Sequence, residues 1–187
     1  MTAKCARRRA AIVVLAVSGA FSLLAALAGD PARSVRALLR IVLLVEGAVY
    51  LGQRDVVLQR TPFDCGPAAL ANLLAVEGRR APPVDSLARL AGTSTRGTSL
   101  GALAEVAGRL GLSVEVRRLD AASAPAPAQL PMVAWVRRSH FVVVLAGPGE
   151  STLTVVDPQV GRYSLPVAVF RRRWSGEAMV PVRPPRT

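Results

Sequence analysis

Cys65 is one of two cysteines in this 187-residue chain, and its surroundings suit nucleophilic chemistry. It lies in the segment Asp64-Cys65-Gly66-Pro67-Ala68-Ala69-Leu70. The proline suits the first turn of a helix, where its missing N–H costs nothing. The positive end of a helix dipole favours a thiolate, and free backbone N–H groups there can stabilise an oxyanion. Taken alone, the segment fits a nucleophile and an ordinary buried cysteine about equally well.

His140 is the only histidine, so it must be the base if Cys65 is a nucleophile activated by an imidazole. It opens an apolar run of valines and could face a cleft while the strand behind it is buried. Asp157 ends the next predicted strand. Antiparallel pairing across the turn at 147–150 would bring the two residues to the same end of a hairpin. There the carboxylate could orient the imidazole, and it could also cap the turn that follows.

Gln59 and Asp64 are two polar residues close to Cys65 in sequence. The amide of Gln59 could donate to an oxyanion beside the Cys65 N–H, although a polar loop residue needs no such role. Asp64 could cap the helix. Cys5 lies in a basic N-terminal tail, so no disulfide to Cys65 is expected. Two cysteines and one histidine leave too few ligands for a structural zinc site, and we expect no metal and no cofactor.

The elements that must position these residues change from helical to β along the chain. Helical periodicity and glycine stops predict helices over 65–78, 85–91 and 99–110. A strand over 112–118 and an Ala/Pro-rich loop over 120–129 follow. Short runs rich in Val, Leu and aromatics then predict strands, with one short helix at 167–174; the strands lie at 131–136, 140–146, 151–157, 162–165 and 178–182. Helices followed by antiparallel strands indicate an α+β fold, with N-terminal helices packed on the sheet.

The N-terminal region, residues 1–52, differs from the domain predicted over 53–187. Residues 10–29 form an uncharged apolar run preceded by Arg7–Arg9. As a helix, about 20 residues span roughly 30 Å, which matches a bilayer core. A transmembrane anchor with its N-terminus inside is favoured over a cleaved signal peptide, because the run is long for a signal sequence.

A second apolar segment, 37–51, is predicted as a helix and holds Arg40 and Glu46. It could lie at the membrane interface, pack on the domain or form a second span. With one span the domain lies outside the cytoplasm, which we expect, and with two it lies inside.

The formal net charge of +12 raises the question of nucleic acid. The arginines are scattered singly and in short runs, and aromatic residues make up only 4% of the chain. Platforms on which bases could stack are therefore scarce. We expect a solvated, arginine-rich surface with affinity for anionic lipid and no nucleic-acid partner.

Several motifs occur together in a specific order. They are Gln59-x5-Cys65 with Gly66-Pro67, Thr95-Arg96-Gly97-Thr98-Ser99, His140-Phe141-Val142-Val143, Asp157-Pro158-Gln159-Val160-Gly161, and Phe170 with Trp174-Ser175-Gly176. This order resembles the bacteriocin-processing cysteine peptidases, papain-like domains that cut leader peptides after a double glycine. The resemblance covers about residues 56–182. It implies Cys65 as nucleophile, His140 as base, Asp157 as the orienting residue and Gln59 in the oxyanion hole.

The best-known members of that family are fused to an ATP-driven exporter, whereas this sequence has no Gly-x-x-x-x-Gly-Lys-Ser/Thr loop and no six-helix membrane domain. We therefore expect a stand-alone, membrane-associated cysteine endopeptidase acting on peptides or proteins. The resemblance implies a double-glycine leader peptide as substrate and a separate ABC exporter as partner. Two alternatives stay open. One is a non-catalytic module that binds leader peptides for an exporter, and the other is an amidase or transpeptidase on the same scaffold.

Overall fold

The computed structural model describes residues 31–123 and 125–183, and the chain divides into two units at residues 45 and 46. The predicted span at 10–29 lies outside the described residues. Within the described part of the chain, no helix combines the length and the apolar character needed to cross a membrane.

Helix α2 (Pro31–Val45) belongs to the first unit. Arg33, Arg36 and Arg40 recur at spacings of three and four and so lie along one face of the helix, with apolar residues around them. The helix predicted over 37–51 is therefore wrong at its C-terminal end. The chain turns at Gly47, whose φ is 85°, and then enters a strand.

The second unit is built on one antiparallel sheet of seven strands in the order β1-β6-β5-β4-β3-β7-β2. The strands are β1 (Val49–Gly52), β2 (Val114–Arg118), β3 (Met132–Val136), β4 (His140–Ala146), β5 (Thr152–Asp157), β6 (Gly161–Pro166) and β7 (Trp174–Pro181). Strands β3 to β6 follow one another as hairpins, because each pairs with the next along the chain. The sequence did not predict β1, whose residues are exposed or half-buried and show no alternation of burial.

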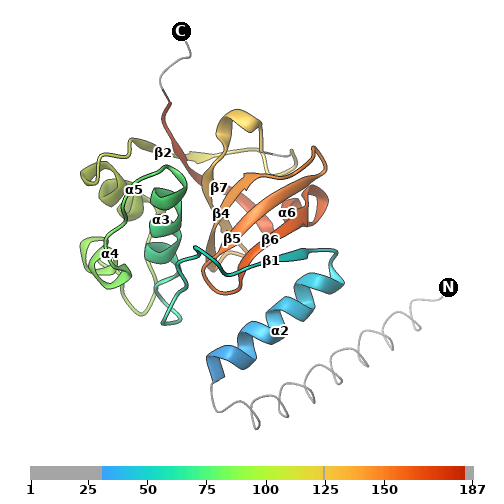
Figure 1. Ribbon diagram of the computed structural model, residues 1–187. Helices are drawn as coiled ribbons and strands as arrows, with labels where there is room; N and C mark the ends of the chain where they lie inside the picture. The colour runs from blue at the N-terminus through green and yellow to red at the C-terminus, as the bar shows by residue number, and fades with distance from the viewer. Residues whose placement is uncertain (1–30, 124, 184–187) are drawn as a thin grey trace, which may run out of the picture. The chain divides into compact units, whose positions relative to one another are not determined.

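Four helices of this unit pack on or beside the sheet: α3 (Cys65–Val76), α4 (Val84–Leu90), α5 (Leu100–Arg109) and α6 (Val167–Arg173), together with a short 3-10 turn, Pro127–Gln129. Helix α3 packs on β3, β4 and β5, α4 packs on α3, and α5 contacts α3, β2 and β7. Figure 1 shows these three helices grouped beside the sheet, while α6 contacts β5 and β6. The antiparallel sheet with helices packed on it agrees with the predicted arrangement.

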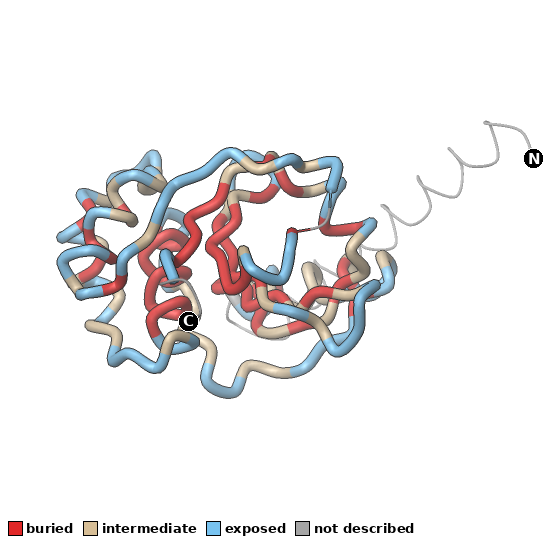
Figure 2. The backbone as a smooth tube through the Cα atoms, turned by 90° about the horizontal axis from the view of Figure 1, so that it is seen from above, coloured by how far each residue is buried: buried red, intermediate tan, exposed pale blue. Residues whose placement is uncertain are grey.

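Helix α3 lies at the centre of the core. Ten of its twelve residues are buried, because its sequence is apolar on every side. Leu70, Leu73 and Leu74 pack with residues of the sheet such as Val143 and Met179. In Figure 2 the buried backbone runs along α3 and the strands beside it. A close-packed interior of this kind holds the first residue of α3, Cys65, in a fixed place relative to the sheet.

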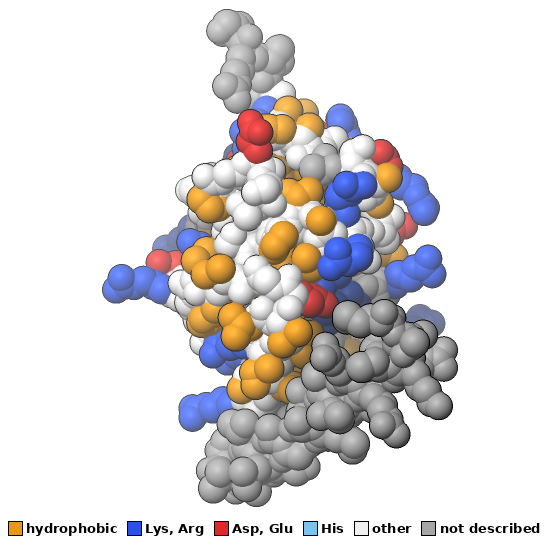
Figure 3. Space-filling view, turned by 90° about the vertical axis from the view of Figure 1, so that its right-hand side faces the viewer, with side chains coloured by type: hydrophobic (Ala, Val, Ile, Leu, Met, Phe, Trp, Pro, Cys, Tyr) orange, Lys and Arg blue, Asp and Glu red, His pale blue; other side chains and the backbone are white. Residues whose placement is uncertain are grey.

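The positive charge is spread over the surface on the face shown in Figure 3. Arginine side chains lie there among apolar and uncharged surface, and acidic side chains are few. On this face the charge therefore belongs to a solvated surface.

Candidate active site

Cys65 is the first residue of α3 and is only 6% exposed. The preceding residue, Asp64, does not cap the helix with its side chain. Instead its carboxylate accepts hydrogen bonds from the backbone N–H groups of Arg60 (3.2 Å) and Thr61 (3.0 Å). The prediction of a capping role is therefore wrong, because this carboxylate bonds to the loop before the helix. It closes that loop against the helix start and so fixes the backbone at Cys65.

Gly66 lets other elements approach the start of α3 closely. A Cβ at this position would lie 3.3 Å from the Thr98 and Leu103 side chains and 3.4 Å from Phe141. The two distances of 3.3 Å are shorter than ordinary van der Waals contacts, and the third is at their lower limit. Glycine therefore brings α5 and β4 against the backbone that carries the cysteine.

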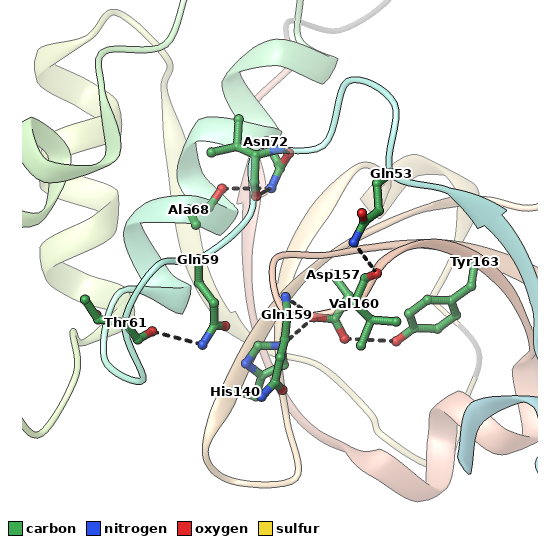
Figure 4. A network of polar contacts seen from close by, with 11 residues as sticks. Gln53, Gln59, Thr61, Ala68, Asn72, His140, Asp157, Gln159, Val160 and Tyr163 are labelled. Carbon is green, nitrogen blue, oxygen red and sulfur yellow. Dashed lines mark hydrogen bonds and ion pairs between the residues drawn. The ribbon is translucent and has the colours of Figure 1, made fainter. Parts of the chain in front are cut away.

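His140 opens β4, and the strand register places Asp157 beside it. Val143 pairs with Val156 across β4 and β5. One step further along the ladder, Asp157 lies opposite Val142, so it is a diagonal neighbour of His140 on the same face of the sheet. The Nε2 atom of His140 lies 2.8 Å from Oδ1 of Asp157. The structure thus brings together the two residues that the hairpin argument placed at one end of the sheet (Figure 4).

Two further groups hold the Asp157 carboxylate, which is itself buried. The backbone N–H of Gln159 donates to Oδ1 at 2.7 Å, and the hydroxyl of Tyr163 donates to Oδ2 at 3.3 Å. Burial first, and then the neighbouring Asp157 charge, raise the pKa of Tyr163 well above its usual value. The phenol therefore remains a donor at physiological pH. Sequence reasoning did not identify Tyr163, although its place on β6 is the diagonal neighbour of Asp157 across the β5–β6 ladder.

The electrostatics at His140 favour a protonated imidazole. Burial lowers its pKa, but the charge and hydrogen bond of Asp157, together with a hydrogen bond and charge from Cys65, raise it to about 10. Because Nε2 is engaged by Asp157, Nδ1 is the ring nitrogen left for the sulfur. The arrangement stabilises an imidazolium between a carboxylate and the cysteine.

Gln59 lies in the loop before α3 and is tied to the turn after Asp157. Its backbone N–H donates to the carbonyl of Pro158 at 2.8 Å. One hydrogen of its amide Nε2 is donated to the carbonyl of Thr61 at 3.0 Å, while the buried Oε1 has no hydrogen-bond partner among the described residues. Figure 4 shows the amide pointing toward His140. A second N–H of Nε2 is therefore left for another acceptor.

Asn72 is a positioning residue that the sequence interpretation missed. Its side chain is 1% exposed, accepts from the N–H of Val57 (2.8 Å) and donates to the Val57 carbonyl (2.9 Å). It also donates to the Ala68 carbonyl at 2.9 Å. These bonds anchor the segment that leads to Gln59 onto α3. An asparagine within an otherwise apolar, fully buried helix was the available signal.

A groove of about 840 Å³ opens at Cys65. Phe63, Trp135 and Phe141 contribute aromatic rings to its lining, and the last two stack with centroids 6.2 Å apart. The Thr95–Ser99 motif lines it as well. The site thus consists of a cysteine, a histidine–carboxylate pair and a mainly apolar groove. In the described part of the chain, no three His, Cys, Asp or Glu side chains are grouped so that they could hold a metal ion.

A cysteine at the start of a central helix, facing a histidine–carboxylate pair on an antiparallel sheet, defines a papain-like cysteine peptidase. The family model described as Peptidase C39 family matches residues 53–186, and the chain belongs to this family of cysteine peptidases. The resemblance seen in the sequence motifs is thereby confirmed.

Relatives by sequence include an "Uncharacterized protein" of Methanothermobacter thermautotrophicus, 30% identical over 134 residues, which cover 72% of this chain and 92% of the relative. A second, from Methanothermobacter marburgensis, is 31% identical over 134 residues, covering 70% and 90%.

Solved structures that share the fold include two peptidase domains of transporters. The peptidase domain of Streptococcus ComA, a bi-functional ABC transporter involved in a quorum sensing pathway, is 25% identical with a TM-score of 0.61, over 68% of this chain and 97% of that one. A double glycine motif protease from an AMS/PCAT transporter, solved with its leader peptide, is 23% identical with a TM-score of 0.60, over 72% and 96%.

Proposed function

We propose that this chain hydrolyses peptide bonds after a double glycine, with Cys65 as nucleophile and His140 as general acid and base. The observation that carries the proposal is the 2.8 Å contact between His140 Nε2 and Asp157 Oδ1, beside a cysteine that itself acts on the His140 pKa. A histidine held in this way by a carboxylate is set to pass a proton to and from Nδ1.

The reaction follows from these contacts. The Cys65 thiolate attacks the scissile carbonyl carbon, forming a C–S bond and an oxyanion that the Cys65 N–H and the free N–H of the Gln59 amide stabilise. The His140 imidazolium then gives its Nδ1 proton to the leaving amine as the C–N bond breaks. In the second half, water attacks the thioester while His140 takes its proton, and the acid and the thiolate are released. Throughout, the Asp157 carboxylate accepts a hydrogen bond from the Nε2–H of His140.

Support for the glycine preference comes from the groove. Cys65 is 6% exposed and lines the groove together with the aromatic side chains of Phe63, Trp135 and Phe141. A peptide backbone without side chains reaches a sulfur in this position most easily. The AMS/PCAT relative is described as a double glycine motif protease, and its likeness to this chain supports the same preference.

The cellular setting is part of the proposal. Residues 10–29 would anchor the chain in a membrane, the amphipathic helix α2 would lie along the lipid surface, and the peptidase domain would face away from the cytoplasm. A separate peptide exporter would then supply the substrate. A reporter fused after residue 52 tests this placement, since activity of a cytoplasmic-only reporter would contradict it.

The decisive experiment incubates the full-length chain with a peptide containing a central Gly-Gly and with a matched Ala-Ala peptide. Mass spectrometry should show cleavage after Gly-Gly and little after Ala-Ala, and none with Cys65→Ala or His140→Ala. Adding an amine acceptor separates hydrolysis from acyl transfer, because a transpeptidase would give the amide product. Binding without cleavage by the unmodified chain would instead indicate a non-catalytic recognition module.

A further inference from the structure

A second hollow of about 680 Å³ adjoins the groove at Cys65. The two share Trp135, Arg138 and Glu177 as lining residues, so they are direct neighbours on the surface. A peptide with its scissile bond at Cys65 and its chain along the groove would therefore continue into this hollow.

Five arginines from three separate segments surround this hollow, against a single glutamate, Glu177. They are Arg118 at the end of β2, Arg137 and Arg138 between β3 and β4, and Arg172 and Arg173 at the end of α6. We refer to the hollow lined by these five residues as the arginine hollow.

Part of the charge in the arginine hollow is compensated within the protein and part is not. Arg173 pairs with Glu46, and Arg118 lies 3.9 Å from Glu177. Among the described residues, Arg137, Arg138 and Arg172 form no ion pair with a carboxylate. The hollow thus presents exposed guanidinium groups, whose planar forks match carboxylates.

The hairpin that carries two of these arginines has an unusual backbone. Arg137 and Arg138 have φ values of 53° and 55°, in the left-handed region that glycine and asparagine adopt more readily. The Arg137 N–H donates to the Arg173 carbonyl at 2.7 Å, which holds the turn against α6. His140 lies two residues after Arg138, at the start of β4. Large cationic side chains at strained positions beside the catalytic base indicate a functional use.

We infer that the arginine hollow binds acidic side chains of the peptide that is cleaved at Cys65, which makes acidic residues some distance from the scissile bond a specificity determinant. The inference rests on the function proposed above. The position of the arginine hollow next to the groove at Cys65 favours a peptide over a lipid headgroup, because a peptide bound at the cysteine extends past these arginines.

The test uses the full-length chain and Gly-Gly peptides in which one glutamate, or a glutamine at the same place, is moved residue by residue along both sides of the site. The ratio of kcat/KM for the glutamate and glutamine peptides is measured within each enzyme. The variant Arg137→Asn/Arg138→Asn removes the charge while keeping residues that tolerate a left-handed backbone. The control Arg89→Gln/Arg109→Gln removes the same charge from α4 and α5.

At one or more positions the glutamate peptide should be preferred by about tenfold, and this preference should shrink at high salt. The asparagine variant should bring the ratio to within about twofold, and the control should retain it. The inference is overturned if this ratio is close to 1 at every position, or if the asparagine variant leaves the ratio unchanged. The proposed function stands in either case if the glutamine peptide is still cleaved.

If the unmodified chain cleaves neither peptide, the proposed function fails and the inference is decided by binding. Fluorescence anisotropy of the same peptides with the Cys65→Ala variant should then show the same glutamate preference and the same loss in the asparagine variant. The last measurement is binding of the chain and of the asparagine variant to vesicles containing phosphatidylglycerol. Binding to them that is lost in the asparagine variant, without any glutamate preference, assigns the arginines to a membrane surface and overturns the inference.

Discussion

Replacing Asp157 with asparagine separates the charge of this residue from its shape. The amide can still accept a hydrogen bond from His140 Nε2, which lies 2.8 Å from Oδ1 in the structure. What is lost is the negative charge that, with Cys65, raises the pKa of His140 to about 10 against the opposing effect of burial. We expect the pKa of His140 to fall.

The size of the change follows from the geometry. An opposite charge in direct contact shifts a pKa by about 1 to 3 units. At about 1.4 kcal/mol per unit, this is about 1.4 to 4 kcal/mol of interaction between the imidazolium and the carboxylate. The pKa of His140 in Asp157→Asn should therefore lie at about 7 to 9.

The same shift predicts how stability depends on pH. The folded-state pKa lies above the usual value of 6.5, so the interaction stabilises the fold fully below about pH 6.5 and its effect is lost as pH rises through about 10. Asp157→Asn should thus lower the free energy of unfolding by about 1 to 4 kcal/mol near pH 6 and much less above pH 10.

Two assays measure the predicted change in the pKa of His140. Because the chain has one histidine, NMR titration of histidine-labelled, untagged protein reports His140 without ambiguity. The alkaline limb of the kcat/KM profile should move to lower pH by the same amount. Tyr163→Phe is the control, because it removes a hydrogen bond to Asp157 and keeps the charge. Two results would refute the electrostatic reasoning. One is a His140 pKa that moves by less than about 0.3 units in Asp157→Asn, and the other is an equally large shift in Tyr163→Phe.

Three further substitutions test the surroundings of the pair. Gln59→Ala should lower kcat by about 10²- to 10³-fold with little change in KM if its amide donates to the oxyanion; an effect confined to KM would exclude that role. Asn72→Ala leaves the N–H and carbonyl of Val57 without their buried partner, so urea unfolding should show a loss of about 2 to 4 kcal/mol. A loss below about 0.5 kcal/mol would show that the segment is anchored elsewhere. Gly66→Ala places a methyl group 3.3 Å from two side chains and should destabilise by about 1 to 3 kcal/mol. The matched Gly108→Ala has open space within 4 Å and should stabilise α5 by about 0.5 to 1 kcal/mol; equal effects of the two changes would contradict the packing argument.

Local sequence patterns were sufficient for most elements of the peptidase domain. Helix α3 was predicted from Cys65 onward because proline at the third position and continuous apolar residues leave few other conformations. Strands β4 and β5 were predicted from short apolar runs on either side of a glycine turn. From that hairpin alone, the proximity of His140 and Asp157 could be anticipated.

The N-terminal part of the domain shows where such patterns fail. Residues 49–51 are apolar and follow a helix, so the pattern predicted that the helix continued. Strand β1 exists because its backbone pairs with β6, a partner more than a hundred residues later in the chain. No local sequence pattern predicts a pairing of this kind, because the hydrogen bonds that stabilise β1 come from the distant strand.

Residue types and their near neighbours were enough to identify the chemical groups of this protein and the elements that carry them: a cysteine at a helix start, the single histidine opening a strand, and a carboxylate ending the next. These depend on residue type and on neighbours within a few positions. The tertiary structure alone decided that Nε2 of His140 meets the carboxylate, that Tyr163 and Asn72 support the site, and that five arginines surround one hollow. Those features depend on strand register and on the packing of segments far apart in the chain. A register shift of one residue would turn a strand residue such as His140, Asp157 or Tyr163 to the other face of the sheet.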